Sequence, residues 1–257
     1  MSLLEKRLLK DVARASVDFR LIEPDDHIMV ALSGGKDSYA MLSLLLGLQK
    51  RAPFGFRLTA VNLDQHQPGF DQHVIVNHCD SLGVDHKMLS KDTYSIVLDK
   101  TPEGKTYCAL CSRLRRGILY NAAQEIGATK IALGHHKDDL IETLLLNMFF
   151  SGQLKSMPPR LHSDDGRNVV IRPLAYCEEE DLQTYSDEKE FPILPCNLCG
   201  SQENLQRKKM KKMVMEMEAQ HPGIRASLFA SMGNLRLSHL LDADLAESAR
   251  PAEITPT

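Results

Sequence analysis

A short polar run follows the first strongly apolar segment of the chain. Residues 33–38 read Ser-Gly-Gly-Lys-Asp-Ser, and they separate the apolar stretch HIMVAL from a second apolar stretch, YAMLSLL. Two glycines let the backbone approach an anion closely, and backbone N–H groups, a helix N-terminus, Lys36 and two hydroxyls can converge there. The spacing differs from the GxxxxGK[ST] loop that handles a γ-phosphate. The run therefore predicts a phosphate-binding loop of a different kind.

The same run resembles the SGGxDS signature of the PP-loop ATP pyrophosphatases. Members of that family cleave ATP between the α- and β-phosphates, adenylate a substrate and release pyrophosphate. The alternative is a plain glycine turn with an exposed lysine, which the strand–loop–helix context disfavours. The resemblance implies that the ATP phosphates are held by Ser33, Gly34, Gly35, Lys36, Asp37 and Ser38.

A second polar run, His135-His136-Lys137-Asp138-Asp139, follows the apolar segment KIAL and precedes DLIETLLLNMFF, which is expected to be a helix. A carboxylate here could hold Mg²⁺ against ATP oxygens or assist proton transfer, and a lysine could neutralise developing charge. Alternatively, one of the two aspartates only caps the helix. Asp64 is a weaker candidate of the same kind. The catalytic candidates are Lys36, Asp37, Lys137 and Asp138.

Four of the six cysteines form two pairs with metal-ligand spacing. Cys108 and Cys111 precede an expected helix around Leu114 to Ile126, and Cys196 and Cys199 follow Pro195. Two such pairs are typical of tetrahedral zinc, and an iron–sulfur cluster is chemically just as admissible. Buried unligated thiols would account for the other two cysteines, Cys79 and Cys177.

Two basic segments adjoin the cysteine pairs. Arg113, Arg115 and Arg116 follow the first pair, and residues 207–212 contribute Arg207, Lys208, Lys209, Lys211 and Lys212 after the second. If the pairs meet in space, positive charge surrounds a site where RNA phosphates could lie. The alternative is a solvated helix face. The absence of tryptophan and the 5% aromatic content argue against an extended base-stacking platform.

These motifs sit on an alternation of short apolar strands and amphipathic helices that begins at Asp26. The alternation predicts an α/β fold with a parallel sheet covered by helices on both faces. Such sheets bind ligands at the carboxyl ends of their strands, where both polar runs fall. We expect an N-terminal helix within residues 1–25, a catalytic domain over 26–200, C-terminal helices over 201–241 and a disordered tail over 242–257.

The composition is that of an ordinary globular protein. Of the 257 residues, 43% are hydrophobic, enough to fill a core, and the net charge of -3 excludes a polybasic protein held to nucleic acid by bulk charge alone. No apolar run reaches the length of a membrane span, and the N-terminal segment mixes both charge signs, unlike a signal peptide. We therefore expect a cytoplasmic protein with no membrane partner, in which the cysteines are not paired as disulfides.

From about Leu8 to His239 the chain closely resembles the tRNA 2-thiocytidine synthetase (TtcA) family of PP-loop ATP pyrophosphatases. The resemblance rests on PEGKTYCALCSRLRRGILYNAAQEIGATKIALGHHKDD, NMFFSGQLKSMPPRLHSDDG and the segments IRPLAYC and PCNLCGSQENLQR. It implies an adenine nucleotide α-hydrolase-like fold and an oxygen-sensitive [4Fe–4S] cluster held by Cys108, Cys111 and Cys199. Cys196 would lie close by without being a ligand, and one iron would be free to carry sulfide.

The resemblance also implies the reaction and the partners. The C2 oxygen of cytidine 32 in a tRNA anticodon loop would be adenylated, and sulfur would then displace AMP. Mg²⁺ would be engaged by Asp37 or Asp138, a cysteine desulfurase would supply persulfide sulfur, and the chain would form a homodimer. A lysidine-forming ligase needs no metal-binding cysteines, and related uridine thiolases generally carry additional zinc-finger cysteines. A non-catalytic redox sensor that binds RNA would not need an intact phosphate loop.

Overall fold

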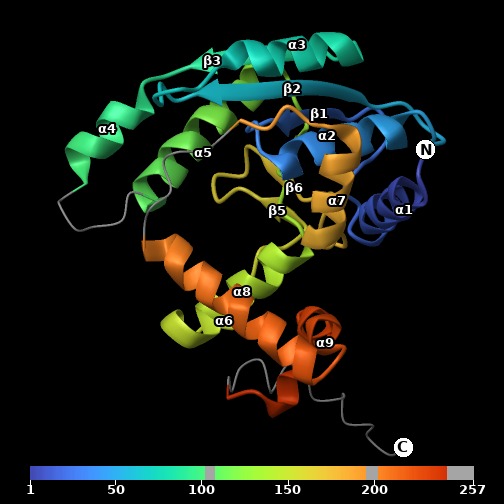
Figure 1. Ribbon diagram of the computed structural model, residues 1–257, viewed down its shortest axis with the longest axis vertical. Coiled ribbons are helices and arrows are strands. Elements are labelled where there is room, and N and C mark those ends of the chain that lie inside the picture. The colour runs from blue at the N-terminus through green and yellow to red at the C-terminus, as the bar shows by residue number, and fades with distance from the viewer. Residues whose placement is uncertain (102–107, 195–201, 242–257) are drawn as a thin grey trace, which may run out of the picture. The chain divides into compact units, whose positions relative to one another are not determined.

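The structure of this chain is a computed structural model that describes residues 1–101, 108–194 and 202–241 (Figure 1). The chain divides into two compact units, Met1–Lys212 and Met213–Thr257. The first unit contains the sheet and all of the site residues discussed below.

A six-stranded sheet organises the first unit. Its strand order is β3-β2-β1-β4-β6-β5, and every neighbouring pair is parallel except β5 with β6, which is antiparallel. The strands are β1 (His27–Ala31), β2 (Arg57–Asp64), β3 (His86–Ser90), β4 (Lys130–Ala132), β5 (Arg160–His162) and β6 (Val169–Ile171). The chain adds β2 and β3 on one side of β1 and then places β4 on the other side, so a topological switch point lies between β1 and β4.

Side chains alternate between the two faces along the central strands. On β1, Ile28 and Val30 belong to the larger hydrophobic cluster, whereas Met29 between them belongs to the smaller one. On β4, Ala132 faces the larger cluster and Ile131 the smaller. This period of two shows that both faces of the sheet are covered, as a parallel sheet requires.

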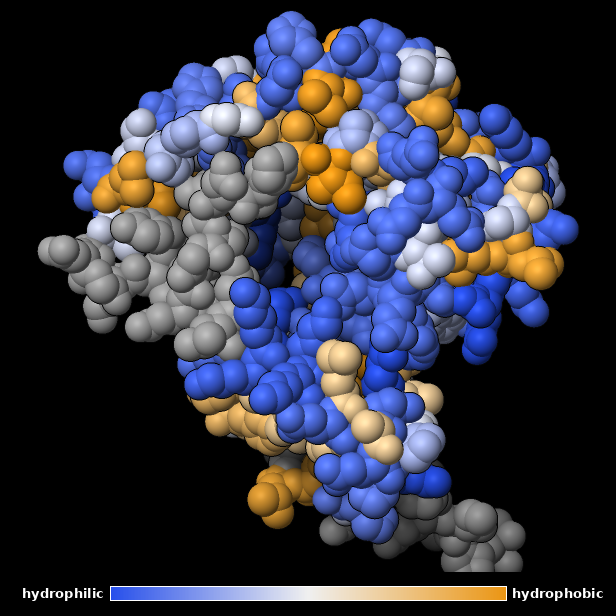
Figure 2. All heavy atoms as spheres, viewed as in Figure 1, coloured by the Kyte–Doolittle hydropathy of each residue, from blue (hydrophilic) through white to orange (hydrophobic). Residues whose placement is uncertain are grey.

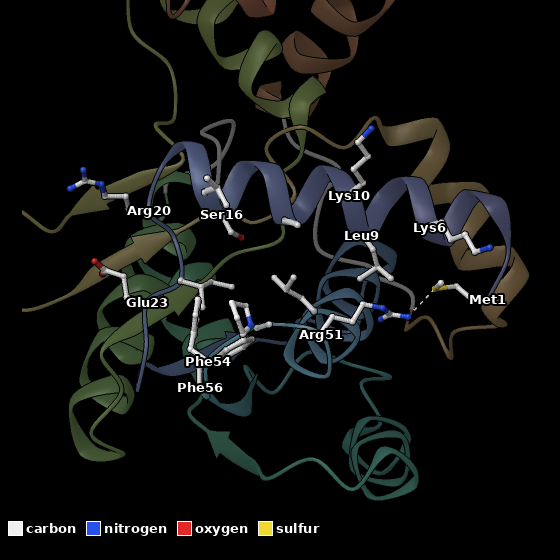
Figure 3. Close-up of a pocket in the computed structure, with 16 residues that line it drawn as sticks. Met1, Lys6, Leu9, Lys10, Ser16, Arg20, Glu23, Arg51, Phe54 and Phe56 are labelled. Carbon is white, nitrogen blue, oxygen red and sulfur yellow. Dashed lines mark hydrogen bonds between the residues drawn. The ribbon is translucent and has the colours of Figure 1, made fainter.

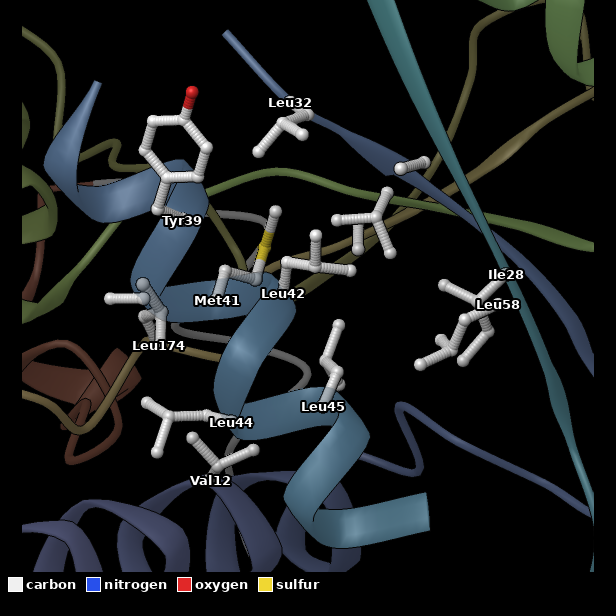
Figure 4. Close-up of a cluster of buried hydrophobic side chains, with 14 of the residues drawn as sticks. Val12, Ile28, Leu32, Tyr39, Met41, Leu42, Leu44, Leu45, Leu58 and Leu174 are labelled. Carbon is white, nitrogen blue, oxygen red and sulfur yellow. The ribbon is translucent and has the colours of Figure 1, made fainter. Parts of the chain in front are cut away.

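The larger cluster is filled by helices α1 (Leu3–Asp18), α2 (Lys36–Gln49) and α7 (Glu179–Lys189), which pack against one another. In Figure 4, Leu42 and Leu45 lie on the side of α2 that faces the strand residues Ile28 and Leu58, and Met41 extends toward Leu32. Helix α3 (Gln72–Leu82) adds Ile75 and Cys79 to the same cluster. The core thus anchors the helix that begins at the phosphate loop.

Helix α5 (Cys108–Glu125) covers the other face, where its residues Ala122 and Ala123 pack with Met29 and Ile131. Helix α4 (Thr93–Lys100) contacts α5. The remaining elements of the first unit are α6 (Lys137–Ser151) and the start of α8 (Gln202–Gln220). The second unit contains the end of α8, helix α9 (Ile224–Ser231) and a short 3₁₀ helix, Leu237–His239.

The predicted α/β fold with helices on both faces of the sheet is confirmed, and three details differ from the prediction. The segment 158–172 forms a β5–β6 hairpin, which adds one antiparallel strand to the sheet that was predicted to be parallel. Helix α4 was not predicted. Helix α5 begins at Cys108, several residues before the expected start near Leu114, so the first cysteine pair lies in the helix and does not precede it.

The predicted division into domains at residues 25, 200 and 241 stays a prediction. Residues 242–257, expected to form a disordered tail, lie outside the described residues. Among the described helices, none is long and apolar enough to cross a membrane.

A cleft of about 620 Å³ lies at the amino ends of β1 and β2, between α1 and the loop that joins α2 to β2. Figure 3 shows Leu9, Phe54 and Phe56 lining it, and Arg51, which donates a hydrogen bond to the sulfur of Met1. The catalytic candidates lie at the opposite, carboxyl ends of the strands. The cleft is therefore separate from the candidate site.

Candidate functional site

The predicted phosphate loop lies at the carboxyl end of β1 and leads directly into α2. Within it, the hydroxyl of Ser38 accepts a hydrogen bond from the N–H of Ser33 at 3.1 Å and donates one to the carbonyl of Gly35 at 2.8 Å. Gly34 has a φ of +84°, a left-handed conformation that glycine adopts without strain. Because these bonds close the loop on itself, its shape is formed before any ligand binds.

The loop meets the second polar run at the topological switch point. A Cβ added at Gly134 would lie 3.2 Å from the backbone carbonyl carbon and oxygen of Asp37 and 3.3 Å from the nitrogen of Ser38. This close approach of two backbones is one that only glycine permits. The structure thus brings the segment 33–38 next to the segment 135–139, as the strand-end argument predicted.

Both candidate lysines are held by carboxylates at the start of α7. Lys137 Nζ lies 2.8 Å from Glu178 Oε1, and Lys36 Nζ lies 3.0 Å from Asp37 Oδ1 and 3.6 Å from Glu179 Oε1. Burial raises the pKa of Glu179, but Lys211 and Lys36 outweigh that effect and leave the pKa below its ordinary value. An arriving phosphate group would compete with these carboxylates for the two lysines.

The two aspartates after the second run have different surroundings. Asp139 accepts a hydrogen bond from the N–H of His136 at 3.1 Å, so it caps helix α6, as the alternative reading of this motif proposed. Asp138 accepts one from the N–H of Glu179 at 2.8 Å and lies 3.7 Å from His136. The carboxylate of Asp138 therefore faces the start of α7.

Carboxylate oxygens are suitable ligands for Mg²⁺, and Asp37 and Asp138 both lie at this edge of the sheet. The described residues contain no preassembled group of three His, Cys, Asp or Glu side chains that could hold a metal ion. A magnesium ion here would therefore depend on ATP oxygens and water for the rest of its coordination, which is its usual mode in nucleotide sites. Asp64, the weaker candidate, accepts a hydrogen bond from the N–H of His66 at 2.7 Å.

Helix α8 contacts the same region through its first half. Arg207 Nη1 lies 3.1 Å from Asp139 and 3.7 Å from Glu142, and Lys211 lies 2.6 Å from Glu179. Burial raises the pKa of Glu142 to about 7 although Arg207 opposes the shift. Of the predicted basic cluster, Arg207 and Lys211 are thus engaged in ion pairs, whereas Lys208 and Lys209 are exposed.

The first cysteine pair lies on the first turn of α5. Residues three apart share a helix face, so this start of the helix places positions 108 and 111 on the same side. The thiol of Cys111 is partly buried and lies 3.4 Å from Oε1 of Gln65, the residue that directly follows β2. The helix therefore carries Cys111 to the carboxyl edge of the sheet, the edge that holds the phosphate loop.

The other two cysteines of the described segments are fully buried in the core cluster and are not placed to be ligands. Burial raises the pKa of Cys79 to about 11 and raises the pKa of Cys177 further. Metal binding needs a thiolate, which such surroundings disfavour. A partly exposed Cys111 at a polar edge is suited to be a ligand, and the full set of Cys108, Cys111 and Cys199 stays a prediction.

The second cysteine pair, Cys196 and Cys199, lies outside the described residues, but the chain leading to it does not. Leu194 donates a backbone hydrogen bond of 2.9 Å to the carbonyl of Gly34, and its side chain lies against that glycine. The described chain thus reaches the phosphate loop two residues before Cys196.

Comparison with known proteins shows the family. Residues 4–216 match the PP-loop domain. Over 242 residues, the chain is 61% identical to the tRNA-cytidine(32) 2-sulfurtransferase of Marinobacter nauticus, covering 94% of this chain and 80% of that protein. It is 60% identical to the protein of the same name from Pseudomonas putida, covering 94% of this chain and 88% of that protein. The chain belongs to the tRNA-cytidine(32) 2-sulfurtransferase family.

A solved structure supports the fold of this sulfurtransferase family member. The U34-tRNA thiolase NcsA from Methanococcus maripaludis, solved with its [4Fe–4S] cluster, superposes with a TM-score of 0.70. The two chains are 21% identical, and the match covers 91% of this chain and 80% of that one. At this identity the likeness shows the PP-loop fold alone.

Several residues of the site were not predicted from the sequence. They include Glu178 and Glu179, which hold the two lysines, and Leu194, which contacts Gly34. Asn62 is buried in β2 and donates a 2.7 Å hydrogen bond to the carbonyl of Leu32, directly before the phosphate loop. A buried asparagine within an apolar strand is the one sequence signal that could have found a loop-supporting residue.

Proposed function

We propose that this chain thiolates cytidine 32 of tRNA, using ATP to activate the base and releasing AMP and pyrophosphate. The observation that supports the proposal is the junction of the phosphate loop with the chain that leads to the cysteines. Gly34 contacts Leu194, and Gln65, at the same edge of the sheet, contacts Cys111. One site could therefore both activate an oxygen and receive sulfur.

In the first step, the C2 oxygen of the cytidine attacks the α-phosphorus of ATP. A new P–O bond forms, the bond to the β-phosphate breaks, and pyrophosphate leaves. The loop N–H groups and Lys36 bind the phosphates, and Lys137 offsets the negative charge that develops on them. Glu178 and Glu179 hold the two lysines in position until the phosphates replace these carboxylates as partners of the lysines.

In the second step, sulfur at the oxidation level of sulfide attacks C2, the C2–O bond breaks, and AMP leaves with the oxygen. Adenylation is needed because the free carbonyl oxygen is a poor leaving group. The family resemblance and the polar position of Cys111 favour a cluster held by Cys108, Cys111 and Cys199. When bound, a [4Fe–4S] cluster would supply the centre that delivers the sulfur.

The proposal includes further expectations about partners. Mg²⁺ would be held by Asp37 or Asp138 together with ATP oxygens. The substrate would be tRNA, a cysteine desulfurase would provide the sulfur, the protein would act in the cytoplasm, and a homodimer would be the working form. These expectations rest on the family resemblance.

The test is a single-turnover reaction with anaerobically reconstituted protein, unmodified tRNA, ATP and sulfide. We expect equal amounts of 2-thiocytidine at position 32 and of released AMP. Mass spectrometry measures the 2-thiocytidine in the digested tRNA and the AMP in the reaction mixture from which the tRNA has been removed. Lys36→Ala should lose both products while keeping its iron content, since Lys36 contacts phosphate and no cluster ligand. Thiolated uridine in place of cytidine, or 2-thiocytidine formed without ATP, would overturn the proposal.

A further inference from the structure

Arg172 is a buried arginine at the carboxyl end of β6, and neither step of the proposed reaction uses it. Its exposed fraction is 6%. It directly follows Ile171, which faces the larger cluster, so the alternation of the strand turns Arg172 toward the opposite face of the sheet, the face covered by α5. Because Ile171 pairs with Ala132 of β4, Arg172 lies beside the second polar run.

The hydrogen bonds of Arg172 go to neutral groups. Its Nε donates to Nδ1 of His135 at 3.3 Å, and its Nη1 donates to the carbonyl of Pro158. Burial and, next to it, the charge of Arg172 lower the pKa of His135 to about 4, so this histidine is uncharged at neutral pH. The structure shows no bond from Nη2 to any residue in the described segments.

The positive charge of Arg172 has no direct counterpart. Across residues 1–101, 108–194 and 202–241, no carboxylate lies within salt-bridge distance of it. Two acidic side chains raise its pKa: Tyr120 and, to a smaller extent, Asp139, whose carboxylate already accepts bonds from Arg207 and the N–H of His136. A buried charge normally has a partner, because burial without one is costly.

The surroundings add positive charge. Burial, the largest effect, and Arg116 of α5 together lower the pKa of Arg172 to about 10 although Tyr120 opposes the shift, which places a second guanidinium in the vicinity. Arg116 is exposed and follows Cys111 on the same helix. Arg172 therefore lies between the run that adjoins the phosphate loop and the helix that carries the first cysteine pair.

We infer that Arg172 binds a phosphate group of a substrate, through its unengaged Nη2. A guanidinium is suited to this role because its fixed donors match phosphate oxygens and it stays charged when buried. His135 and Pro158 hold the side chain in place so that little freedom is lost on binding. The inference rests on the proposed function, in which two substrates carry phosphate groups, ATP and the tRNA backbone.

The test compares Arg172→Gln, Arg172→Lys and the control Arg160→Gln. Arg160 is the matched control because it lies on the neighbouring strand β5 but is 3.5 Å from a carboxylate, Glu23, and donates to the carbonyl of Arg20. Cluster-loaded protein is titrated in one arm with α,β-methylene ATP and in the other with unmodified tRNA at several salt concentrations. Thermal unfolding is recorded for each variant.

We expect Arg172→Gln to weaken binding about tenfold in one of the two arms, which identifies the source of the phosphate. If the source is tRNA, the slope of log K against log salt should also fall by about one. Arg172→Lys should recover part of the loss, and Arg160→Gln should bind both ligands normally. Unchanged affinity in both arms for folded Arg172→Gln would overturn the inference.

Should Arg172→Gln fail to fold, Arg172→Lys decides the question. A loss of about threefold or more in either arm supports the inference, since lysine keeps the charge but not the planar geometry, and unchanged affinity in both arms overturns it. Because both arms measure binding without turnover, they are independent of thiolation. A wild-type chain that binds both ligands but forms no 2-thiocytidine would contradict the proposed function and leave this inference intact.

Discussion

The backbone N–H of Leu194 donates a hydrogen bond of 2.9 Å to the carbonyl oxygen of Gly34. These residues are 160 positions apart in the sequence, and one belongs to the phosphate loop while the other directly precedes Pro195 and Cys196. Gly34 also has a φ of +84°, and a Cβ added there would lie 3.1 Å from Cδ1 of Leu194. The loop proposed to bind ATP and the chain that leads to the second cysteine pair are therefore in direct contact.

Gly34→Ala should lower ATP-dependent AMP formation by tenfold or more, on the order of the loss of one transition-state contact. The added methyl group is strained at this φ and pushes against Leu194, so both the loop and the chain before Cys196 must shift. Gly166→Ala is the control, because Gly166 has a φ of +70° with no atom near its added Cβ. Both variants should lose about 1–2 kcal/mol of stability. Equal AMP formation by the two variants would show that the contact is not functional.

The basic residues of helix α8 should fall into two groups, one that stabilises the folded chain and one that binds RNA. Replacing the exposed Lys208 and Lys209 by Glu should weaken tRNA binding and reduce its salt dependence, with ATP affinity unchanged. Arg207→Gln should instead lower the free energy of unfolding, since it leaves Asp139 and Glu142 without their partner. Filter binding at several salt concentrations and urea unfolding measure the two effects. If the double reversal leaves the salt slope unchanged, the exposed lysines are only a solvated face.

Buried Glu142 should make the stability of the chain depend on pH. Its pKa is raised by burial from 4.5 to about 7, so the folded state binds a proton that the unfolded state releases in this range. Glu142 therefore contributes up to about 3 kcal/mol to the free energy of unfolding. This contribution is full below about pH 4.5 and is lost as the pH rises through about 7. Glu142→Gln does not undergo this loss. Its free energy of unfolding in urea, compared with that of the wild type, should therefore rise between about pH 4.5 and 7. The lowered pKa of His135 makes the stability rise with pH, the opposite of the effect of Glu142. Because both chains contain His135, its effect cancels in the comparison.

A constant difference between Glu142→Gln and the wild type from pH 4.5 to 8 would contradict the assignment. The obvious confounding effect is the lost ion pair with Arg207, which lies 3.7 Å from Glu142. Measuring the same difference in the Arg207→Gln background separates the two effects, because burial, together with Asp139 and Glu179, still raises the pKa of Glu142 when Arg207 is absent.

The cysteine variants should behave unequally. Ser at Cys108, Cys111 or Cys199 should abolish iron and acid-labile sulfide after anaerobic reconstitution, and Ser at Cys196 should retain both. A closed zinc site with four cysteines would be colourless, insensitive to air and damaged about equally at all four positions. Equal loss in the four variants, or zinc with full activity, would overturn the cluster proposal.

The sequence predicted the fold and the meeting of the two polar runs because both follow from strand ends in a parallel sheet. The run SGGKDS follows β1 and the run GHHKDD follows β4, and these strands are neighbours on either side of the switch point. The start of α5 was placed too late, since CALCSRL has little helical periodicity and its helical register became evident only in the folded chain. Roles that depend on long-range pairing, such as Glu179 with Lys36, leave no local pattern to detect.

The ion pairs of the basic cluster after the second cysteine pair also could not be predicted from the sequence. A run of five cations between 207 and 212 gives no indication of which of its members face acids on α6 and α7. The structure assigns Arg207 to Asp139 and Lys211 to Glu179, four positions apart and therefore on one helix face. Arg172 was likewise invisible, because its burial depends on β6 pairing with β4.

The central step of the proposed reaction is the activation of the C2 oxygen of the cytidine by ATP. Isotope transfer tests this step directly, with tRNA that carries ¹⁸O at the C2 position of cytidine 32 and cluster-loaded protein, ATP and sulfide. If the oxygen attacks the α-phosphorus and leaves with AMP, each molecule of 2-thiocytidine formed should be accompanied by one AMP that contains ¹⁸O. Mass spectrometry of AMP and of the digested tRNA measures both. Formation of 2-thiocytidine with unlabelled AMP would contradict the account.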